Sequence, residues 1–199
     1  ASLACPGGNI TGVYAMSVEL SGKRLELLAE AVPVIKRIAV LTTSSKFKAT
    51  NEYKEMEAAA RALGVKLQVL RALDPDTIDS AFLAMIQERA DALVLIPHAR
   101  YVQHRERILK QVAKHRLPSI YSNNEDVEKG GLMSYGVNYA AEYRRTAIYA
   151  DKILKGAKPA DLPVEQPTKF EPLINLKAAK QIGLTIPPNV LARADRVIR

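Results

Sequence analysis

The chain of 199 residues is 48% hydrophobic and 25% charged, which is ordinary for a folded globular protein and excludes a disordered one. Its net charge of +8 invites a nucleic-acid or membrane-surface hypothesis, but the basic residues are spread along helical stretches and accompanied by acids, so we expect no nucleic-acid partner. The single cysteine, Cys5, excludes an internal disulfide framework, and the longest strongly apolar run, residues 91–97, is shorter than the roughly 20 residues that span a bilayer.

The first distinctive stretch is PGGNITGV at residues 6–13. Its three glycines lack the spacing of a phosphate-binding loop, and no Lys-Ser/Thr pair follows them. The triplet from Asn9 to Thr11 matches the N-glycosylation pattern, which arises often by chance. A third interpretation is a backbone crossover in which glycines such as Gly12 relieve steric limits on an extended segment.

Apolar runs and amphipathic stretches alternate regularly over the following residues. The helix predicted at residues 51–64 has its apolar residues at helical spacing and ends at Gly64. The helix predicted at residues 74–90 begins with Asp74 and Pro75, which favour a helix start. A third, basic helix is expected at residues 100–116, and the predicted strands are residues 37–43, 65–72, 91–97, 117–123 and 131–137.

Several of these strands are continuously apolar, RIAVL and DALVLIP among them. Strands of this kind are buried on both faces, which indicates a parallel sheet covered by helices. We therefore expect an α/β fold with a doubly wound parallel sheet and right-handed crossovers.

The pattern changes after Val137. A long helix at residues 138–156 is followed by a proline-broken connector at residues 157–170. The remaining residues predict a strand, a short helix that ends at Gly183 and a last helix that begins at Pro188. This tail is too short for a core of its own, so it must pack on the first sheet, on a partner or on another segment.

Ligands of open parallel sheets bind beyond the carboxyl ends of the strands. The residues at those ends are polar and almost uncharged, which suits hydrogen bonding to a small polar solute better than proton abstraction or phosphoryl transfer. The candidate ligand-binding residues are Thr42, Thr43, Ser44, His98, Ser122, Asn123, Tyr135 and Gly136.

His98 is the sharpest single candidate. It could contact a solute, or act as the general base of a small α/β metabolite-processing enzyme together with the Thr/Ser cluster. The enzyme hypothesis needs an orienting acid and a nucleophile, and neither is visible nearby in the sequence. His104 follows six residues later, which is not the spacing of helical zinc ligands. We predict no catalytic residue, no metal and no cofactor.

Several stretches together resemble one known family. They include PGGNITGV, ELSGKRLELLAEAVP, RADALVLIP and GGLMSYGVNYAAEYRR, and the tail LPVEQPTKFEPLINLKAAKQIGLTIP is the most specific of them. This pattern is similar to ABC transporter substrate-binding proteins of the tryptophan/phenylalanine-binding type, and the similarity covers essentially the whole chain.

The resemblance implies a two-lobe periplasmic binding protein of type I, with the ligand between the lobes. Residues 1–13 would be the hinge segment, with Asn9, Thr11 and Gly12 at the crossover, and residues 14–136 would form lobe two. Residues 137–199 would comprise the return helix, the connector and a C-terminal strand-helix appendage that packs on lobe one or on a partner. A secretory leader and most of lobe one would precede Ala1 in a full-length member.

The resemblance also implies a function. The chain would be the substrate-binding component of an ABC import system, capturing a small polar solute such as an amino acid, with an ABC permease as its partner. The full-length protein would be periplasmic, or extracellular and lipid-anchored. Exposed remnants of lobe one would favour a homo-oligomer. The alternatives are the small α/β enzyme described above and a basic regulatory domain that binds nucleic acid.

Overall fold

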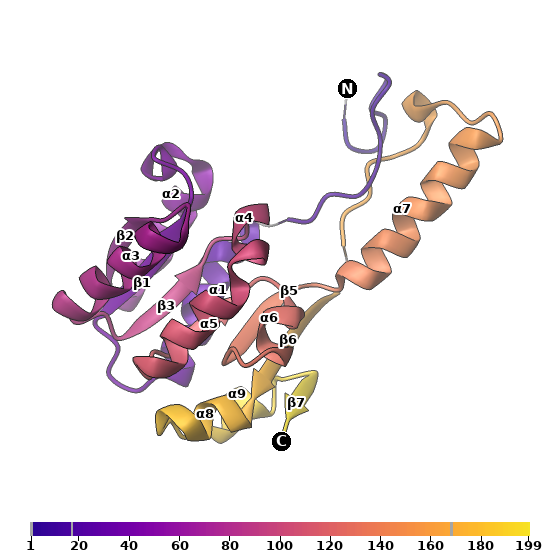
Figure 1. Ribbon diagram of the computed structural model, residues 1–199. Helices are drawn as coiled ribbons and strands as arrows, with labels where there is room; N and C mark the ends of the chain where they lie inside the picture. Colours follow the sequence, from indigo (N-terminus) through magenta and orange to yellow (C-terminus); the bar gives the residue numbers. More distant parts are fainter. Residues whose placement is uncertain (1, 17, 168) are drawn as a thin grey trace. The chain divides into compact units, whose positions relative to one another are not determined.

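The computed structural model describes residues 2–16, 18–167 and 169–199, and these form two compact units (Figure 1). The sheet unit is Ser17–Gly136 with Glu171–Arg199. The crossover unit is Ala1–Met16 with Val137–Phe170. The chain therefore passes between the two units three times.

The sheet unit contains a seven-stranded sheet in the order β2-β1-β3-β4-β5-β6-β7. Strand β1 pairs in parallel with β2 and β3, β3 pairs with β4, β4 with β5, and β6 with β7. The predicted parallel α/β sheet is confirmed. The strands are β1 (Arg37–Thr42), β2 (Lys66–Arg71), β3 (Ala92–Leu95), β4 (Ser119–Tyr121), β5 (Met133–Val137), β6 (Phe170–Asn175) and β7 (Arg196–Ile198).

Helices cover both faces of this sheet (Figure 1). On one face, α1 and α2 place Leu25, Leu28 and Met56 in a core cluster with the strands. On the other face, α3 and α5 contribute residues such as Phe82 and Ile108 to a second cluster. The helices of this unit are α1 (Glu19–Ala31), α2 (Asn51–Leu63), α3 (Pro75–Gln87), α4 (Ala99–Gln103), α5 (Arg105–Lys114), α6 (Asn124–Glu128), α8 (Leu176–Ile182) and α9 (Pro188–Leu191).

The predicted ends of two helices are confirmed. Asp74 caps α3, because its side chain accepts a hydrogen bond from the Thr77 backbone N–H while the Thr77 hydroxyl accepts one from the Asp74 N–H, and Pro75 is the first helical residue. Gly64 ends α2 in the left-handed conformation with φ 69°.

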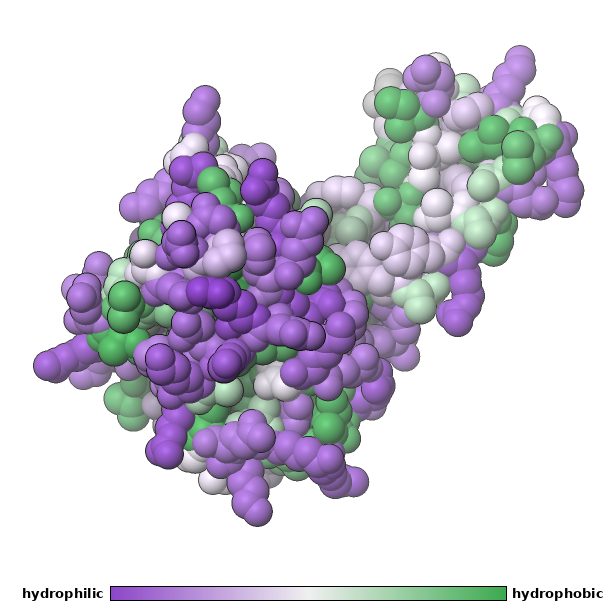
Figure 2. Space-filling model, viewed as in Figure 1, coloured by the Kyte–Doolittle hydropathy of each residue, from purple (hydrophilic) through white to green (hydrophobic). Residues whose placement is uncertain are grey.

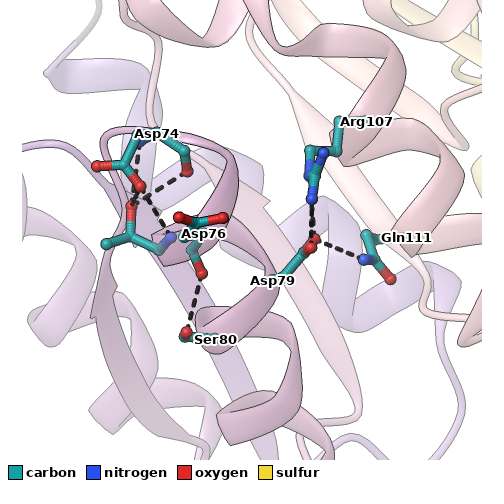
Figure 3. A network of polar contacts seen from close by, with 7 residues as sticks. Asp74, Asp76, Asp79, Ser80, Arg107 and Gln111 are labelled. Atoms are coloured by element: carbon teal, nitrogen blue, oxygen red, sulfur yellow. Dashed lines mark hydrogen bonds and ion pairs between the residues drawn. The ribbon is translucent and has the colours of Figure 1, made fainter.

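A polar network joins α3 to α5 (Figure 3). The guanidinium of Arg107 forms an ion pair with the carboxylate of Asp79, and Gln111 Nε2 donates to Asp79 Oδ1 at 2.7 Å. The hydrogen bonds from Arg107 and then from Gln111 hold the pKa of Asp79 below its usual value. The network therefore fixes the relative position of two helices on the same face of the sheet.

The prediction that the C-terminal elements pack on the other lobe is wrong. Strand β6 lies beside β5 in the sheet, and its Leu173 and Ile174 are buried in the two core clusters. Asn175 then caps α8 and donates through Nδ2 to the carbonyl oxygen of Val127 at 3.0 Å. The tail packs here because its apolar residues, Val190 of α9 included, complete the core of the sheet unit.

Two further elements differ from the sequence prediction. The last helix, predicted from Pro188 onward, ends at Leu191, because Arg196–Ile198 pairs in parallel with β6 as strand β7. Helix α1 was not among the predicted elements, although it buries Leu25 and Leu28 completely.

The crossover unit consists of helix α7 (Tyr139–Leu154) and two extended segments that lie side by side. Val13 forms a parallel bridge with Glu165, the Tyr14 N–H donates to the Glu165 carbonyl oxygen at 2.8 Å, and the Tyr149 hydroxyl donates to the carbonyl oxygen of Pro163 at 2.7 Å. Pairing therefore joins the start of the chain to the connector after α7.

Much of the apolar surface of the crossover unit is exposed. Among the residues described, only Val137, Tyr149 and Leu162 are buried hydrophobics in this unit. Figure 2 shows apolar side chains lying among polar ones on the molecular surface. A core this small cannot stabilise an independent domain. The exposed large hydrophobic residues of the unit are Leu3, Ile10, Tyr14, Tyr143, Ile148, Ile153 and Leu154.

Candidate functional site

The strand register places three predicted site residues at one level of the sheet. Thr42 lies one residue beyond the last paired row of β1 with β3. Ser122 and Tyr135 lie one residue beyond the last paired row of β4 with β5. Because these strands are parallel, the three residues lie at the edge of the sheet where the strands end, which we call the carboxyl edge. The sheet thus brings together residues that are far apart in the sequence.

At the end of β1 the hydroxyls are partly committed to the backbone. Thr42 is only 2% exposed, and its Oγ1 accepts a hydrogen bond from the Ser44 N–H at 3.2 Å. Ser44 Oγ in turn accepts one from the Lys46 N–H at 3.2 Å. Thr42 therefore shapes the loop, whereas the half-buried Thr43 and the exposed Ser44 are accessible to a solute.

His98 caps helix α4 at the end of β3. It is exposed, and its Nδ1 accepts a hydrogen bond from the Arg100 N–H at 3.2 Å. An imidazole that accepts through Nδ1 carries its proton on Nε2. The nitrogen left for a solute is therefore a hydrogen-bond donor, which favours a role in binding over a role as a base.

Ser122, Asn123 and Gly136 lie where β4 and β5 end. The Asn123 side chain caps α6 by accepting from the Glu125 N–H at 2.9 Å. Ser122 is buried, and its carbonyl oxygen lies only 2.1 Å from the position that a Cβ atom on Gly136 would occupy. No side chain fits at Gly136, so the two backbones can approach closely only with glycine there.

The backbone carbonyl group of Tyr135 is held by Arg24, a residue that the sequence did not predict as part of the site. Arg24 of α1 is 2% exposed, and its Nε donates to the Tyr135 carbonyl oxygen at 2.8 Å. Its Nη1 lies 3.4 Å from the hydroxyl of Ser21, which donates to Glu52 Oε1 at 2.7 Å. An arginine inside an otherwise amphipathic helix was the signal, but the helix itself was not predicted.

An ion pair lies next to the carboxyl edge in α6. Arg105 Nε donates to Asp126 Oδ1, and Arg105 Nη1 lies 2.8 Å from Glu125 Oε1. Burial raises the pKa of the Asp126 carboxyl group, while the hydrogen bond and charge of Arg105 oppose that rise. The pair fixes α6 on α5, and the Asp126 carboxylate is occupied by this contact.

The three predicted hinge residues lie in the crossover unit. Thr11 Oγ1 donates to the carbonyl oxygen of Leu162 at 2.7 Å, and the Gly12 carbonyl oxygen accepts from the Glu165 N–H at 2.9 Å. Asn9 is exposed and lines a shallow surface pocket with Leu3 and neighbouring residues. Thr11 and Gly12 are thus paired with the connector after α7.

Two kinds of feature are absent from the part of the chain that the structure describes. Residues 2–16, 18–167 and 169–199 contain no group of three or more His, Cys, Asp or Glu side chains placed to hold a metal ion. In the same part of the chain, no helix has both the length and the apolar character needed to cross a bilayer.

Comparison with solved structures gave matches over nearly the whole chain. An ABC domain from Streptococcus pneumoniae in complex with L-Trp is 28% identical with a TM-score of 0.85, covering 100% of this chain and 68% of that one. A conserved domain protein from Vibrio cholerae is 29% identical with a TM-score of 0.87, covering 98% of this chain and 65% of that one. The chain thus spans about two thirds of the length of these relatives.

A third structure shows the fold alone. A ligand-free, open substrate-binding protein with adhesive properties from Clostridium difficile is 24% identical with a TM-score of 0.70, covering 99% of this chain and 65% of that one. Comparison with curated proteins gave no match. The family described as ABC transporter substrate binding protein matches residues 1–198, which confirms the predicted resemblance. The chain belongs to the family of ABC transporter substrate-binding proteins.

Proposed function

We propose that the chain binds a small polar solute at the carboxyl edge of its sheet, as the substrate-binding component of an ABC import system. The observation that carries this proposal is the set of neutral polar groups that the parallel strands bring to one edge, in a chain of the ABC substrate-binding family. Thr43, Ser44, Asn123 and the Nε2–H of His98 offer donors and acceptors there.

An amino acid is the solute class that the comparisons favour. The Streptococcus pneumoniae domain was solved with L-Trp and is 28% identical to this chain. Hydroxyl and amide groups of the kind found at the carboxyl edge suit the ammonium and carboxylate groups of an amino acid. We therefore place amino acids first among the solutes to be tested.

No covalent chemistry is part of this proposal. The hydrogen bond from the Arg100 N–H to His98 Nδ1 leaves a donor, not a base, on the exposed side of the imidazole. The Asp126 carboxylate, in helix α6 next to the carboxyl edge, is held by Arg105. Capture would proceed by a shift between open and closed forms of two lobes, with the crossover unit as this chain's part of the other lobe.

The proposed partners follow from this role. The closed form would dock on an ABC permease, and the full-length protein would be periplasmic, or extracellular and lipid-anchored. Nucleic acid is not among the proposed partners. We also propose that the exposed apolar surface of the crossover unit supports self-association of the chain.

A ligand screen tests the proposed function. Thermal unfolding of the chain is followed with the twenty amino acids, small sugars and carboxylic acids, and we expect a subset of amino acids to raise the midpoint. The variant Ser44→Ala with Thr43→Val should abolish that rise, whereas Ser80→Ala, whose hydroxyl donates to the Asp76 carbonyl oxygen in α3, should keep it. Turnover of a solute that His98→Ala abolishes would instead support the enzyme hypothesis.

A further inference from the structure

Exposed cations surround one half of the carboxyl edge. Lys46 and Lys48 follow β1, Arg71 is the last residue of β2, and Arg100 follows β3. The loop segments 43–50 and 96–104 contain no Asp or Glu. The ends of these three adjacent strands therefore carry positive charge with little acidic compensation.

Several cations elsewhere in the sheet unit have acidic partners. Arg37 Nη1 lies 2.9 Å from Glu88 Oε2, and Arg105 and Arg107 pair with carboxylates as described above. Within the described ranges, none of the four cations at the carboxyl edge forms an ion pair. The nearest acid in sequence after β2, Asp74, uses its carboxylate to cap α3.

Arg71 is the best-positioned cation of the four. It pairs with Thr42 in the register of β1 and β2, and its Nε donates to the Thr43 carbonyl oxygen at 3.2 Å. This single hydrogen bond anchors the guanidinium beside two of the predicted binding residues. In the part of the chain that the structure describes, the two terminal nitrogens of Arg71 form no hydrogen bond. Their N–H groups therefore remain available as a planar fork of donors.

We infer that the solute carries a carboxylate, and that Arg71 binds this group at the β1–β2 end of the carboxyl edge. The inference rests on the proposed function and adds the residue that selects the solute's charge. A guanidinium recognises a carboxylate through two parallel N–H···O hydrogen bonds, which are stronger than bonds between neutral groups. Lys46, Lys48 and Arg100 add a positive potential that attracts anions from solution.

The test compares acids with their amides. Isotope-labelled chain is titrated at constant ionic strength with L-tryptophan and L-tryptophanamide, L-leucine and L-leucinamide, and succinate and succinamide, and backbone amide resonances are followed. We expect the acids to shift resonances of residues 43–46, 71 and 98–100. The amides should bind at least about tenfold more weakly than the acids. Arg71→Gln should remove the difference between acid and amide. The control Arg61→Gln, an exposed arginine of α2 paired with Glu57, should leave it unchanged.

Each contrary outcome has a distinct meaning. Equal binding of acids and amides, or an equal loss for both in Arg71→Gln, overturns the role of Arg71 while leaving solute binding at the carboxyl edge intact. Inorganic phosphate that competes as well as the acids would show a general anion site and overturn the selection of a carboxylate. If none of the six compounds shifts a resonance of the carboxyl edge, the inference and the proposed solute binding at this edge both fail.

Discussion

The carbonyl oxygen of Ser122 lies 2.1 Å from the point where a Cβ atom on Gly136 would stand. A methyl group at that distance forces the ends of β4 and β5 apart. We expect Gly136→Ala to lower the free energy of unfolding by about 1–3 kcal/mol, the range for overpacking a fitted interior. Urea unfolding followed by circular dichroism measures the change.

Gly22 supplies the control for this prediction. A Cβ atom there would meet Ala59 Cβ at 3.6 Å, which is ordinary van der Waals contact between helices α1 and α2. Gly22→Ala should therefore raise the stability by up to about 1 kcal/mol, because alanine favours a helix over glycine. Equal effects of the two substitutions would contradict the close approach at Gly136.

Arg24 should be essential for the end of β5. Arg24→Met removes the donor to the Tyr135 carbonyl oxygen, and we expect it to lower the free energy of unfolding by about 1–3 kcal/mol. The neighbouring Lys23→Met changes an exposed side chain and should stay within about 0.5 kcal/mol of the unsubstituted protein. Chemical denaturation of both variants checks the prediction, and similar midpoints for the two would argue against a special role for Arg24.

The contact between Asp79 and Arg107 should depend on pH. The pKa of Asp79 is lowered in the folded protein, so its contribution to stability is present above the unfolded value of 3.8 and is lost as the pH falls through the lower folded value. A double-mutant cycle with Asp79→Asn and Arg107→Gln should show a favourable coupling at pH 7 that is lost progressively as the pH falls below the unfolded value of 3.8. Melting temperatures measured across this range test it, and a coupling that grows in acid would contradict the sign.

Self-association should depend on one stripe of helix α7. Tyr139, Tyr143, Ala150 and Leu154 follow each other at helical spacing, and Leu154 is 86% exposed. We expect Leu154→Ser to weaken association about tenfold or more, since burial of a leucine contributes about 1.5–3 kcal/mol. Sedimentation velocity over a concentration series measures this. Leu83→Ser, at an exposed leucine of α3 in the sheet unit, is the control, and an equal effect there would place the contact elsewhere.

The sequence predicted best those elements whose signals are local. Continuous apolar runs identified β1 and β3, and Gly64, Asp74 and Pro75 identified helix ends, because capping and strand burial depend on neighbours in the chain. The location of the C-terminal tail could not be predicted in this way. Whether β6 joins this sheet or another depends on pairing with β5, across a gap of more than thirty residues.

The residues of the candidate site also divide into those with local sequence signals and those placed by long-range contacts. Reading strand ends identified Thr43, Ser44 and His98, because parallel strands gather their ends at one edge. Arg71 was not predicted, since the end of β2 was not included among the strand ends. Arg24 was not predicted because its contact with Tyr135 joins residues 111 positions apart. Partners of this kind become visible only when the three-dimensional packing is known.

The pairing of Val13 with Glu165 has a consequence for synthesis of the protein on the ribosome. Residues 11–14 must wait until some 150 further residues have been made before the connector segment that pairs with them exists. Closing so long a loop slows folding. During that delay the hydrogen-bonding groups of residues 11–14 that pair with the connector lack their partners, and the edge of β5 stays open until β6 arrives. The nascent chain is therefore most vulnerable just before strand β6 (Phe170–Asn175) emerges.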